Sequence, residues 1–570
     1  MVRAEVFPRA LLDELGALRG AYGRVAAARK FKLLVRLLSM PINRGLELAR
    51  LHDELLFAAG FPDNADIHAV TAGALSTFAK RVRRLSAAER RKLDDSGIAG
   101  TAGTHDFSYD VARWLLLQRE HVTIDWRVME DPERLDLLLR QTLLPVEVEA
   151  FDSGEFSTEE WVGLASAKSA AQTLAWLLGS APERSPGAGI HAWRDLYDAA
   201  EVQLAWERRE SPWSVSRNRA PVVRIIKRRA FRHAPMDVAS HVLTPLTSIR
   251  RLRGSVAEQW RDACIATLTA RAREVWPIVC ANLEEIYVIP LGDGVDLCVV
   301  GVTHEHRLPL EANYGYVMFA NGVPIGYGGA TALGAQANTG INIFESFRRT
   351  EAAFLFAQTL RSFRTLFGVT RFIVNPYQIG ADNDEALESG SYWFYHRLGF
   401  RSRDPIIAAL AEAENARNAK RRGRRSSLAI LRRLASSDVV LELPDVGETA
   451  LFEERWVLTI GRAVAEHLAP HALGRRREYL TQLSHELCTL LTGEKRPLRP
   501  EERAGAVHLV PVIALLRDEV ARWPSADRAA LWELVGLKGR PQERPFAQAS
   551  RAHARWWRAV ANTCERMESA

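Results

Sequence analysis

The hydrophobic pattern divides the chain into a helical part, a strand-rich part and a second helical part. From Arg9 to about Leu178, apolar residues mostly recur three or four positions apart, which is typical of amphipathic helices. Between Ile286 and Val374 the pattern changes to short runs of β-branched residues, and helical spacing returns after Pro405. We therefore predict an α+β protein whose mixed sheet lies between mostly helical N- and C-terminal regions.

The strand-rich part predicts the order hairpin, hairpin, strand, helix, strand, helix. Its clearest local signal is Asn321-Gly322, because both residues tolerate the positive φ angles of a tight hairpin turn. Gly328-Gly329 favours either a bulge or the close approach of another group. The expected elements are strands at 286–290, 295–302, 314–320, 323–329 and 341–345, a helix at 348–367, a strand at 369–374, a helix at 384–398 and a strand at 438–443. A further amphipathic helix is expected over 255–282, ahead of the first strand.

The length of 570 residues implies several domains, because one hydrophobic core usually serves about 100–200 residues. A basic stretch with prolines at 212, 221, 235 and 245 cannot form one long helix and is interpreted as a linker. The predicted organisation is a helical domain at 1–205, the linker at 206–254, the sheet-containing domain at 255–445 and a helical domain at 446–570.

Composition indicates a folded soluble protein, with 47% hydrophobic and 25% charged residues. The net charge of +7 is small for this length, although basic residues gather at 224–232, 250–253, 420–425 and 475–477, where they can attract phosphates. The 5 cysteines form no CxxC pair, so we expect neither a disulfide framework nor a metal site. A charged N-terminus and the lack of a long apolar run predict a cytoplasmic protein without a membrane span.

Two local features have a chemical rationale. The first is the predicted strand-to-helix junction at 344–353, where free backbone N–H groups and the helix dipole create a phosphate site. The second is the sequence Tyr392-Trp393-Phe394-Tyr395-His396-Arg397-Leu398-Gly399-Phe400, in which an aromatic pair precedes a helix stop.

These two features, in this order, resemble the GNAT superfamily of N-acyltransferases over residues of about 284–403. Tyr395, four residues ahead of Gly399, matches the FYxxxGF-like end of the last core helix of that family. Arg348 and Ala353 match the ends of its RxxGxG/A motif, which holds the pyrophosphate of CoA, but Glu351 replaces the central glycine. A carboxylate facing a pyrophosphate would repel it unless the side chain turns away.

The resemblance implies an N-acyltransferase that takes an acyl group from acetyl-CoA or a longer acyl-CoA and passes it to an amine acceptor that the sequence does not identify. Some GNAT-like enzymes use aminoacyl-tRNA or an acyl-carrier protein as donor, and the basic clusters leave both open. The residues that the resemblance assigns to the donor are Ile343, Arg348, Arg349, Thr350, Glu351, Ala352 and Ala353.

Acyl transfer to an amine requires a group that accepts the amine proton and benefits from one that protonates the leaving thiolate. The resemblance assigns the proton donor to Tyr395, and Glu345 is the first candidate for the base, ahead of Glu311 and His304. The backbone N–H of Ile343 is a candidate for polarising the thioester carbonyl.

Two residues after the strand at 369–374 are candidates for contact with the acceptor. They are Asn375 and Tyr377, which follow the strand end that opens on the acceptor side in this family. The alternative role for polar residues in this stretch is turn formation and helix capping, for which Asn383 is suited.

A different class of function is also consistent with the sequence. The GNAT-like part would then be a catalytically degenerate binding or scaffold module, and the basic helical regions would bind RNA or an acidic partner. Stabilisation by acyl-CoA distinguishes the two hypotheses. The sequence does not indicate the oligomeric state.

Overall fold

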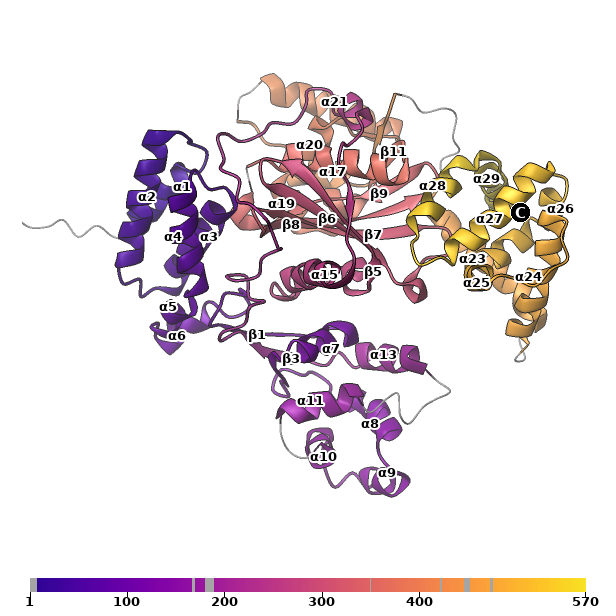
Figure 1. Cartoon of the computed structure of the whole chain (residues 1–570), viewed down its shortest axis with the longest axis horizontal. Coiled ribbons are helices and arrows are strands. Elements are labelled where there is room, and N and C mark those ends of the chain that lie inside the picture. Colours follow the sequence, from indigo (N-terminus) through magenta and orange to yellow (C-terminus); the bar gives the residue numbers. More distant parts are fainter. Residues whose placement is uncertain are drawn as a thin grey trace, which may run out of the picture.

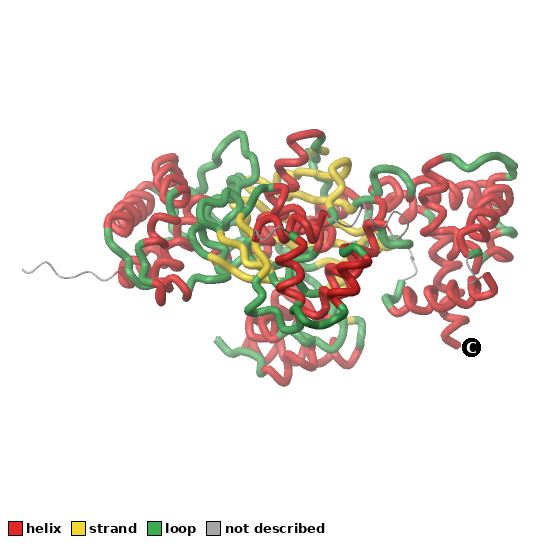
Figure 2. The backbone as a smooth tube through the Cα atoms, turned by 90° about the horizontal axis from the view of Figure 1, so that it is seen from below, coloured by secondary structure: helices red, strands yellow, loops and turns green. Residues whose placement is uncertain are grey.

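The computed structural model describes residues 8–166, 170–179, 189–348, 350–420, 423–444, 452–471 and 475–569. A large mixed sheet occupies the centre, with the first helices of the chain (α1–α6) at one end, the C-terminal helices at the other, and the later N-terminal helices (α7–α13) below it (Figure 1). The view from below shows the same arrangement, with the strands enclosed by helices (Figure 2). The protein is therefore of the mixed α+β class, as the hydrophobic pattern predicts.

The central sheet has ten strands in the order β12-β13-β11-β9-β8-β7-β6-β5-β4, with β10 paired to β8. Its strands are β4 (Arg250–Arg251), β5 (Ala281–Gly292), β6 (Val295–Val302), β7 (Ala312–Ala320), β8 (Val323–Leu333), β9 (Gln336–Thr339), β10 (Asn342–Ile343), β11 (Arg371–Val374), β12 (Arg401–Ser402) and β13 (Val439–Glu442). Strands β9 and β11 are parallel, whereas the other paired strands are antiparallel.

Helices cover both faces of this sheet. The helical elements of the central part are α14 (Val238–Leu243), α15 (Gly254–Thr269), α16 (Trp276–Val279), η2 (His304–His306), η3 (Glu345–Phe347), α17 (Ala352–Phe367), α18 (Pro376–Ile379), α19 (Asp384–Ser389), α20 (Ser391–Arg397), α21 (Pro405–Lys420) and α22 (Leu428–Leu434). Helix α17 packs on one face, where Phe363 contacts Tyr316 of β7, and α15 packs on the other, where Trp260 contacts Phe319 (Figure 1).

The predicted hairpin turn between β7 and β8 is confirmed. Asn321 and Gly322 have φ angles of 46° and 79°, as a turn of this kind requires. The Asn321 amide also accepts a hydrogen bond from the N–H of Ile226 at 2.7 Å and donates to the carbonyl of Gly60 at 2.9 Å. The turn therefore holds the linker and the N-terminal helices against the sheet.

Two predicted helices are interrupted, and both predictions of a continuous helix are wrong. The helix expected over 255–282 divides into α15 and α16, with Ala272 in the left-handed region (φ 51°) and Pro277 at the start of α16, where its missing N–H is tolerated. The helix expected over 384–398 divides into α19 and α20 at Gly390, which has a φ of 70°.

Strand β9 forms in a polar segment for which the sequence predicts no strand. Its residue Gln336 is buried, and the side-chain amide exchanges hydrogen bonds of 2.8 and 3.1 Å with the backbone of Phe452. Because a distant segment satisfies the polar side chain, the strand needs no apolar residue at this position.

The N-terminal region is mostly helical but also contains a three-stranded antiparallel sheet in the order β1-β3-β2. Its elements are α1 (Pro8–Ala17), α2 (Arg24–Ser39), α3 (Gly45–Gly60), α4 (Ala65–Ser76), α5 (Ala79–Arg83), α6 (Ala87–Arg91), β1 (Ala102–His105), α7 (Tyr109–Leu117), β2 (His121–Ile124), η1 (Pro132–Leu135), α8 (Asp136–Thr142), α9 (Pro145–Phe151), α10 (Thr158–Ala165), α11 (Ala170–Gly179), α13 (Gly189–Ala199) and β3 (Leu204–Glu207). Most of its apolar residues share one continuous core with the central sheet, while Leu139, Leu143, Phe151, Trp161 and Val162 form a small separate cluster.

The C-terminal region is helical and has its own hydrophobic core. Its elements are α23 (Arg455–Leu468), η4 (Ala469–His471), α24 (Arg476–Thr492), α25 (Pro500–Leu515), α26 (Arg517–Val520), α27 (Ser525–Lys538), α28 (Arg544–Ala552) and α29 (Ala554–Ser569). The domain boundaries derived from the sequence stay predictions. No helix among the described residues has both the length and the apolar character that crossing a membrane requires.

Candidate functional site

The candidate site lies where the chain of β9 and β10 leaves its neighbour β11. Strand β9 pairs with β11 as far as Asn338, which lies opposite Ile373. After Gly340 and Ile341 the chain continues as β10, which pairs with β8 but not with β11. Two adjacent parallel strands therefore diverge at Gly340, and polar groups from other elements meet at this point.

Close packing around Gly340 depends on two glycines. The Tyr316 hydroxyl donates a hydrogen bond of 2.5 Å to the carbonyl of Gly340. A Cβ atom on Gly328 would lie 2.4 Å from both of these oxygens, and one on Gly340 would lie 2.8 Å from Oε1 of Gln378. The groups that come close to Gly328 are therefore the Tyr316 hydroxyl and the Gly340 carbonyl, and the approach of a ligand to this glycine stays a prediction.

Tyr395 joins this group from helix α20. Its buried hydroxyl accepts a hydrogen bond of 3.4 Å from the N–H of Ile341, and its ring packs edge-on against Phe356. Burial raises the pKa of Tyr395 to about 12, which outweighs the opposite effect of the Ile341 N–H. The hydroxyl therefore keeps its proton at neutral pH.

Two residues of this group, Tyr316 and Gln378, were not singled out by the sequence. Gln378 belongs to the short helix α18 and Tyr316 to β7, so neither forms part of a local motif with Tyr395. The available signal was Gly328-Gly329, since paired glycines in a strand mark a place where something else comes close.

The other feature of the site is the start of helix α17. The helix begins at Ala352 with Glu351 as its N-cap residue, and the side chains of Ala352 and Ala353 are half-buried. Thr350 donates a hydrogen bond to the carbonyl of Phe347 at 2.7 Å. The predicted donor residue Arg349 lies outside the described residues.

The Glu351 carboxylate points into the protein rather than toward the helix start. It forms an ion pair with Arg228 in which both side chains are essentially inaccessible, at 0% and 1% exposed, and it accepts a hydrogen bond of 2.6 Å from the N–H of Arg232. Its charge is therefore compensated by the basic segment 224–232, which the sequence places in the linker. Tertiary structure brings this segment to the start of α17.

Arg348 and Ile343 are in contact. Arg348 is exposed, its Nε donates a hydrogen bond of 3.3 Å to the carbonyl of Ile343, and its guanidinium pairs with Glu385. Phe344, which directly follows Ile343, donates its N–H to the carbonyl of Ile325 at 3.1 Å. Strand β10 is thereby held on one side by β8 and on the other by an arginine that precedes α17.

Glu345 lies on η3, between β10 and α17, with an exposed side chain. It is close enough to Asp53 of helix α3 to raise the pKa of that carboxyl, although burial is the main cause. Asp53 accepts a hydrogen bond of 2.7 Å from Ser346. Asp53 is thus a second carboxylate beside Glu345, supplied by a helix almost 300 positions earlier, and the sequence offers no signal for it.

The weaker sequence candidates lie elsewhere. The backbone carbonyl of Glu311 accepts a hydrogen bond of 2.7 Å from Lys538, and His304 packs edge-on against His508, so both contact the C-terminal helices. Asn375 caps α18 by accepting a hydrogen bond from the N–H of Gln378, and Tyr377 is 55% exposed beside it. Asn383 caps α19 as predicted.

Comparisons with known proteins were made over the whole chain. No family model, curated protein or solved structure matches it. The function is therefore inferred from the geometry of the residues and from the resemblance in the order of its motifs.

A buried polar network connects the sheet to the C-terminal helices. Glu285 of β5 accepts hydrogen bonds from the Tyr314 hydroxyl at 3.0 Å and from the N–H groups of Glu543 and Arg544 at 2.8 Å each. Burial raises the pKa of Glu285 to about 7, while these two N–H groups act in the opposite direction. The network binds α28 to the sheet and contains one carboxyl, that of Glu285, with a pKa near neutral pH.

The pKa of Glu285 predicts a pH dependence of stability. Because the folded pKa of about 7 lies above the ordinary value of 4.5, the stabilising contribution is complete below about pH 4.5 and is lost as the pH rises through 7. Relative to Glu285→Gln, the wild type is expected to lose about 1–3 kcal/mol between pH 5 and 8. Thermal unfolding of both proteins at several pH values measures this, and parallel curves would contradict it. The comparison separates Glu285 from His304 and His508, whose lowered pKa values act in the opposite direction.

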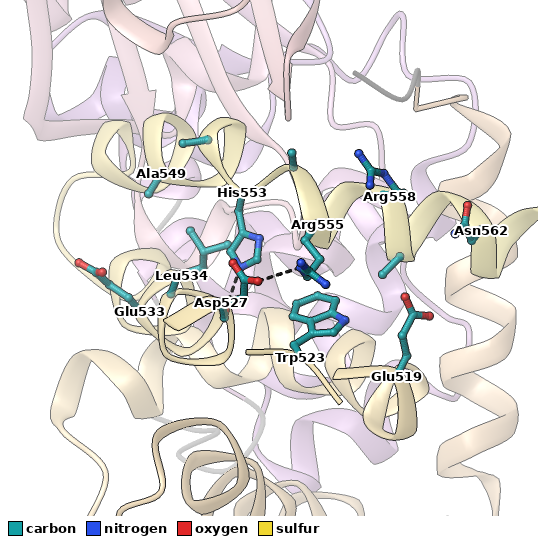
Figure 3. A pocket seen from close by; sticks show the side chains of 14 residues that line it. Glu519, Trp523, Asp527, Glu533, Leu534, Ala549, His553, Arg555, Arg558 and Asn562 are labelled. Carbon is teal, nitrogen blue, oxygen red and sulfur yellow. Dashed lines mark hydrogen bonds and ion pairs between the residues drawn. The ribbon is translucent and has the colours of Figure 1, made fainter. Parts of the chain in front are cut away.

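A groove of about 640 Å³ lies within the C-terminal helices (Figure 3). Two of its polar side chains pair with the same residue, since Arg555 forms an ion pair of 2.8 Å with Asp527 and His553 hydrogen-bonds the Asp527 carbonyl at 3.0 Å. Trp523 lies beside them in the same view. Asp527 is thus occupied by two neighbouring side chains, and we assign no chemistry to this groove.

Asp110, Cys280 and His306 lie together between the N-terminal helices and the sheet, with potential ligand atoms within 4.8 Å of one another. Arg194 contacts two of them, His306 at 2.8 Å and Asp110 at 3.2 Å. A guanidinium thus already bridges the group and would repel a metal cation, so we assign no metal to it.

Proposed function

We propose that the protein is a GNAT-like N-acyltransferase that moves an acyl group from acetyl-CoA or a longer acyl-CoA to an amine. The observation that carries the proposal is the position of the Tyr395 hydroxyl, at the N–H of Ile341 where β10 diverges from β11. A proton donor at the opening between two strands is what the resemblance assigns to this tyrosine.

The strand order supports the resemblance. Strands β9 and β11 are adjacent, parallel and connected through α17, while the strands before β9 form antiparallel pairs in chain order. The helix that follows β11 in this scheme is α20, which carries Tyr395 and is followed by Gly399. Strand β9, helix α17, strand β11 and helix α20 thus follow one another along the chain in the order that the resemblance implies.

In the proposed donor complex, the acyl-pantetheine arm lies between β10 and β11, and the pyrophosphate lies at the start of α17. The unpaired N–H groups at Ala352 and Ala353 and the helix dipole favour an anion there. The replacement of the family's glycine by Glu351 is compatible with this, because the carboxylate is turned inward and paired with Arg228.

The proposed reaction is direct attack of the amine on the thioester. A C–N bond forms, the C–S bond breaks, the amine proton passes to Glu345 and the thiolate receives the proton of Tyr395. The N–H of Ile343 polarises the thioester carbonyl in this scheme. Burial keeps the Tyr395 hydroxyl protonated at neutral pH but makes it a weaker acid than an ordinary tyrosine, so the proposal rests on the position of the hydroxyl and not on its pKa.

The first experiment measures stabilisation by acyl-CoA and then the release of CoA. Acetyl-CoA or a longer acyl-CoA is expected to raise the melting temperature, and Tyr395→Phe is expected to lower kcat by about 100-fold because proton transfer of this kind contributes about 10²–10⁴. Glu345→Gln tests the base in the same assay.

The matched control is Tyr392→Phe. Tyr392 is buried in the same helix, and its hydroxyl has no hydrogen-bond partner among the described residues, so its loss is expected to leave the rate nearly unchanged. Failure of every acyl-CoA to stabilise the protein, together with salt-sensitive RNA binding, would favour the scaffold hypothesis instead.

A further inference from the structure

Three arginines, Arg219, Arg271 and Arg273, gather on the face of strand β10 that lies away from Tyr316. Arg271, just after α15, lies 3.9 Å above the ring of Phe344, and Arg273 donates a hydrogen bond of 2.8 Å to the Tyr327 hydroxyl. The rings of Tyr327 and Phe344 stack at 5.6 Å. Because Tyr327 lies opposite Asn342 of β10, these arginines are immediately beside the proposed reaction site.

The two faces of the sheet carry different chemistry at this point. Successive residues of a strand point to opposite faces. Gly328 lies against the Tyr316 hydroxyl on the α17 face, so the neighbouring Tyr327 points to the α15 face, where Arg273 binds it. The Tyr316 and Tyr395 hydroxyls thus lie on one side of the diverging strands, and the guanidinium groups with the Tyr327 hydroxyl lie on the other.

The positive charge of this cluster is compensated in part by Asp53, which is close enough to Arg271 to act on its pKa. Among the residues that the structure describes, neither Arg271, Arg273 nor the neighbouring Arg219 forms an ion pair. Arg271 donates to the carbonyl of Thr267 at 2.7 Å. Burial, and then repulsion by Arg273, lowers its pKa to about 9, whereas Asp53 has the opposite effect. Arg228 differs from these three arginines, because its guanidinium forms an ion pair with Glu351.

We propose that Arg271 and Arg273 bind an anionic group on the amine acceptor, so that the substrate is an amine that also carries a carboxylate or a phosphate. Planar guanidinium groups bind both kinds of anion through paired hydrogen bonds. Asp53, which is close enough to Arg271 to act on its pKa, and the neighbouring Glu345 supply negative charge for the ammonium end of such a molecule. The inference rests on the proposed acyltransferase function and narrows its acceptor class.

The test uses pairs of amines that differ only in the anionic group. The probes are α-amino acids against their amides, for the carboxylate, and phosphoethanolamine against ethanolamine, for the phosphate. CoA release with acetyl-CoA or a longer acyl-CoA is measured for the wild type, Arg271→Gln, Arg273→Gln and Arg253→Gln. Arg253 is the control because it is exposed at the opposite end of α15.

The anionic member of one pair is expected to be the better acceptor. Arg271→Gln and Arg273→Gln are expected to raise its KM by at least about tenfold, because a hydrogen bond between charged groups contributes about 1.5–3 kcal/mol. The KM for acyl-CoA and the kinetics of the Arg253 control are expected to stay within about twofold. The pair of amines in which the anionic member is the better acceptor shows whether the arginines bind a carboxylate or a phosphate.

Other outcomes separate this inference from the proposed function. If neutral amines react as well as anionic ones, or if Arg271→Gln weakens acyl-CoA binding instead, the inference is wrong while acyl transfer stands. If no acyl-CoA binds or reacts, the proposed function fails. In that case, titration calorimetry measures the binding of the same amino acids and of phosphoethanolamine to the wild type and to Arg271→Gln. The inference is overturned if the wild type binds none of these molecules. It is also overturned if Arg271→Gln binds them as tightly as the wild type does.

Discussion

Replacing Arg228 with methionine is expected to lower the free energy of unfolding by about 3–5 kcal/mol, because the substitution leaves the Glu351 carboxylate buried without its counter-ion. Both side chains are essentially inaccessible, so water cannot replace the guanidinium. Arg228 also donates a hydrogen bond of 2.8 Å to the carbonyl of Asp293 and lies 4.9 Å from the ring of Phe61, and these contacts are lost as well. Thermal and urea unfolding followed by circular dichroism measure the effect.

The control for this variant is Arg232→Met in the same basic segment. Arg232 pairs with Asp293 at the surface, where both side chains are partly exposed, and the loss is expected to stay below about 1 kcal/mol. The double variant Arg228→Met with Glu351→Leu removes both charges and is expected to be more stable than Arg228→Met alone. Equal stability of Arg228→Met and the wild type would show that the pair does not hold the start of α17.

The second large effect is expected at the junction with the C-terminal helices. Lys538 and Glu543 form an ion pair in which both side chains are fully buried, and Lys538 also donates to the carbonyl of Glu311 at 2.7 Å. Lys538→Met leaves Glu543 without its cation, with Glu285 nearby, so the junction is expected to lose about 3–5 kcal/mol. Hydrogen exchange followed by mass spectrometry is expected to show faster exchange in α27 and α28.

Lys495→Met is the matched control, because Lys495 is exposed in the same region and its replacement is expected to change exchange very little. The double variant Lys538→Met with Glu543→Leu is expected to recover part of the protection. If Lys538→Met exchanges at the wild-type rate in α27 and α28, the buried pair does not stabilise the junction.

Sequence reasoning was accurate where short-range backbone preferences decide the structure. Asn321-Gly322 forms the hairpin turn, and Gly368 ends α17 in the left-handed conformation with a φ of 76°. Both features depend on residues within a few positions of each other. The prediction of continuous helices failed at Ala272 and Gly390, because periodicity alone does not register one residue that leaves the helical conformation.

The candidate site was predictable in part. The sequence placed Tyr395 and the start of α17 in one unit, and the structure locates Tyr395 at the diverging strands. It did not reveal Asp53 or the contact between Arg228 and Glu351, since their partners lie far away in the chain and neither has a periodic signal.

The sequence by itself therefore determined the α+β class, the hairpin turn and the end of α17, since these depend on local conformational preferences and on the period of apolar residues. Only the tertiary structure decided that Glu351 turns inward to Arg228 and that Arg271 and Arg273 lie beside β10 without forming an ion pair to any residue that the structure describes. The physical reason is that charge compensation in a protein interior depends on which distant segments the fold brings within a few ångströms of one another.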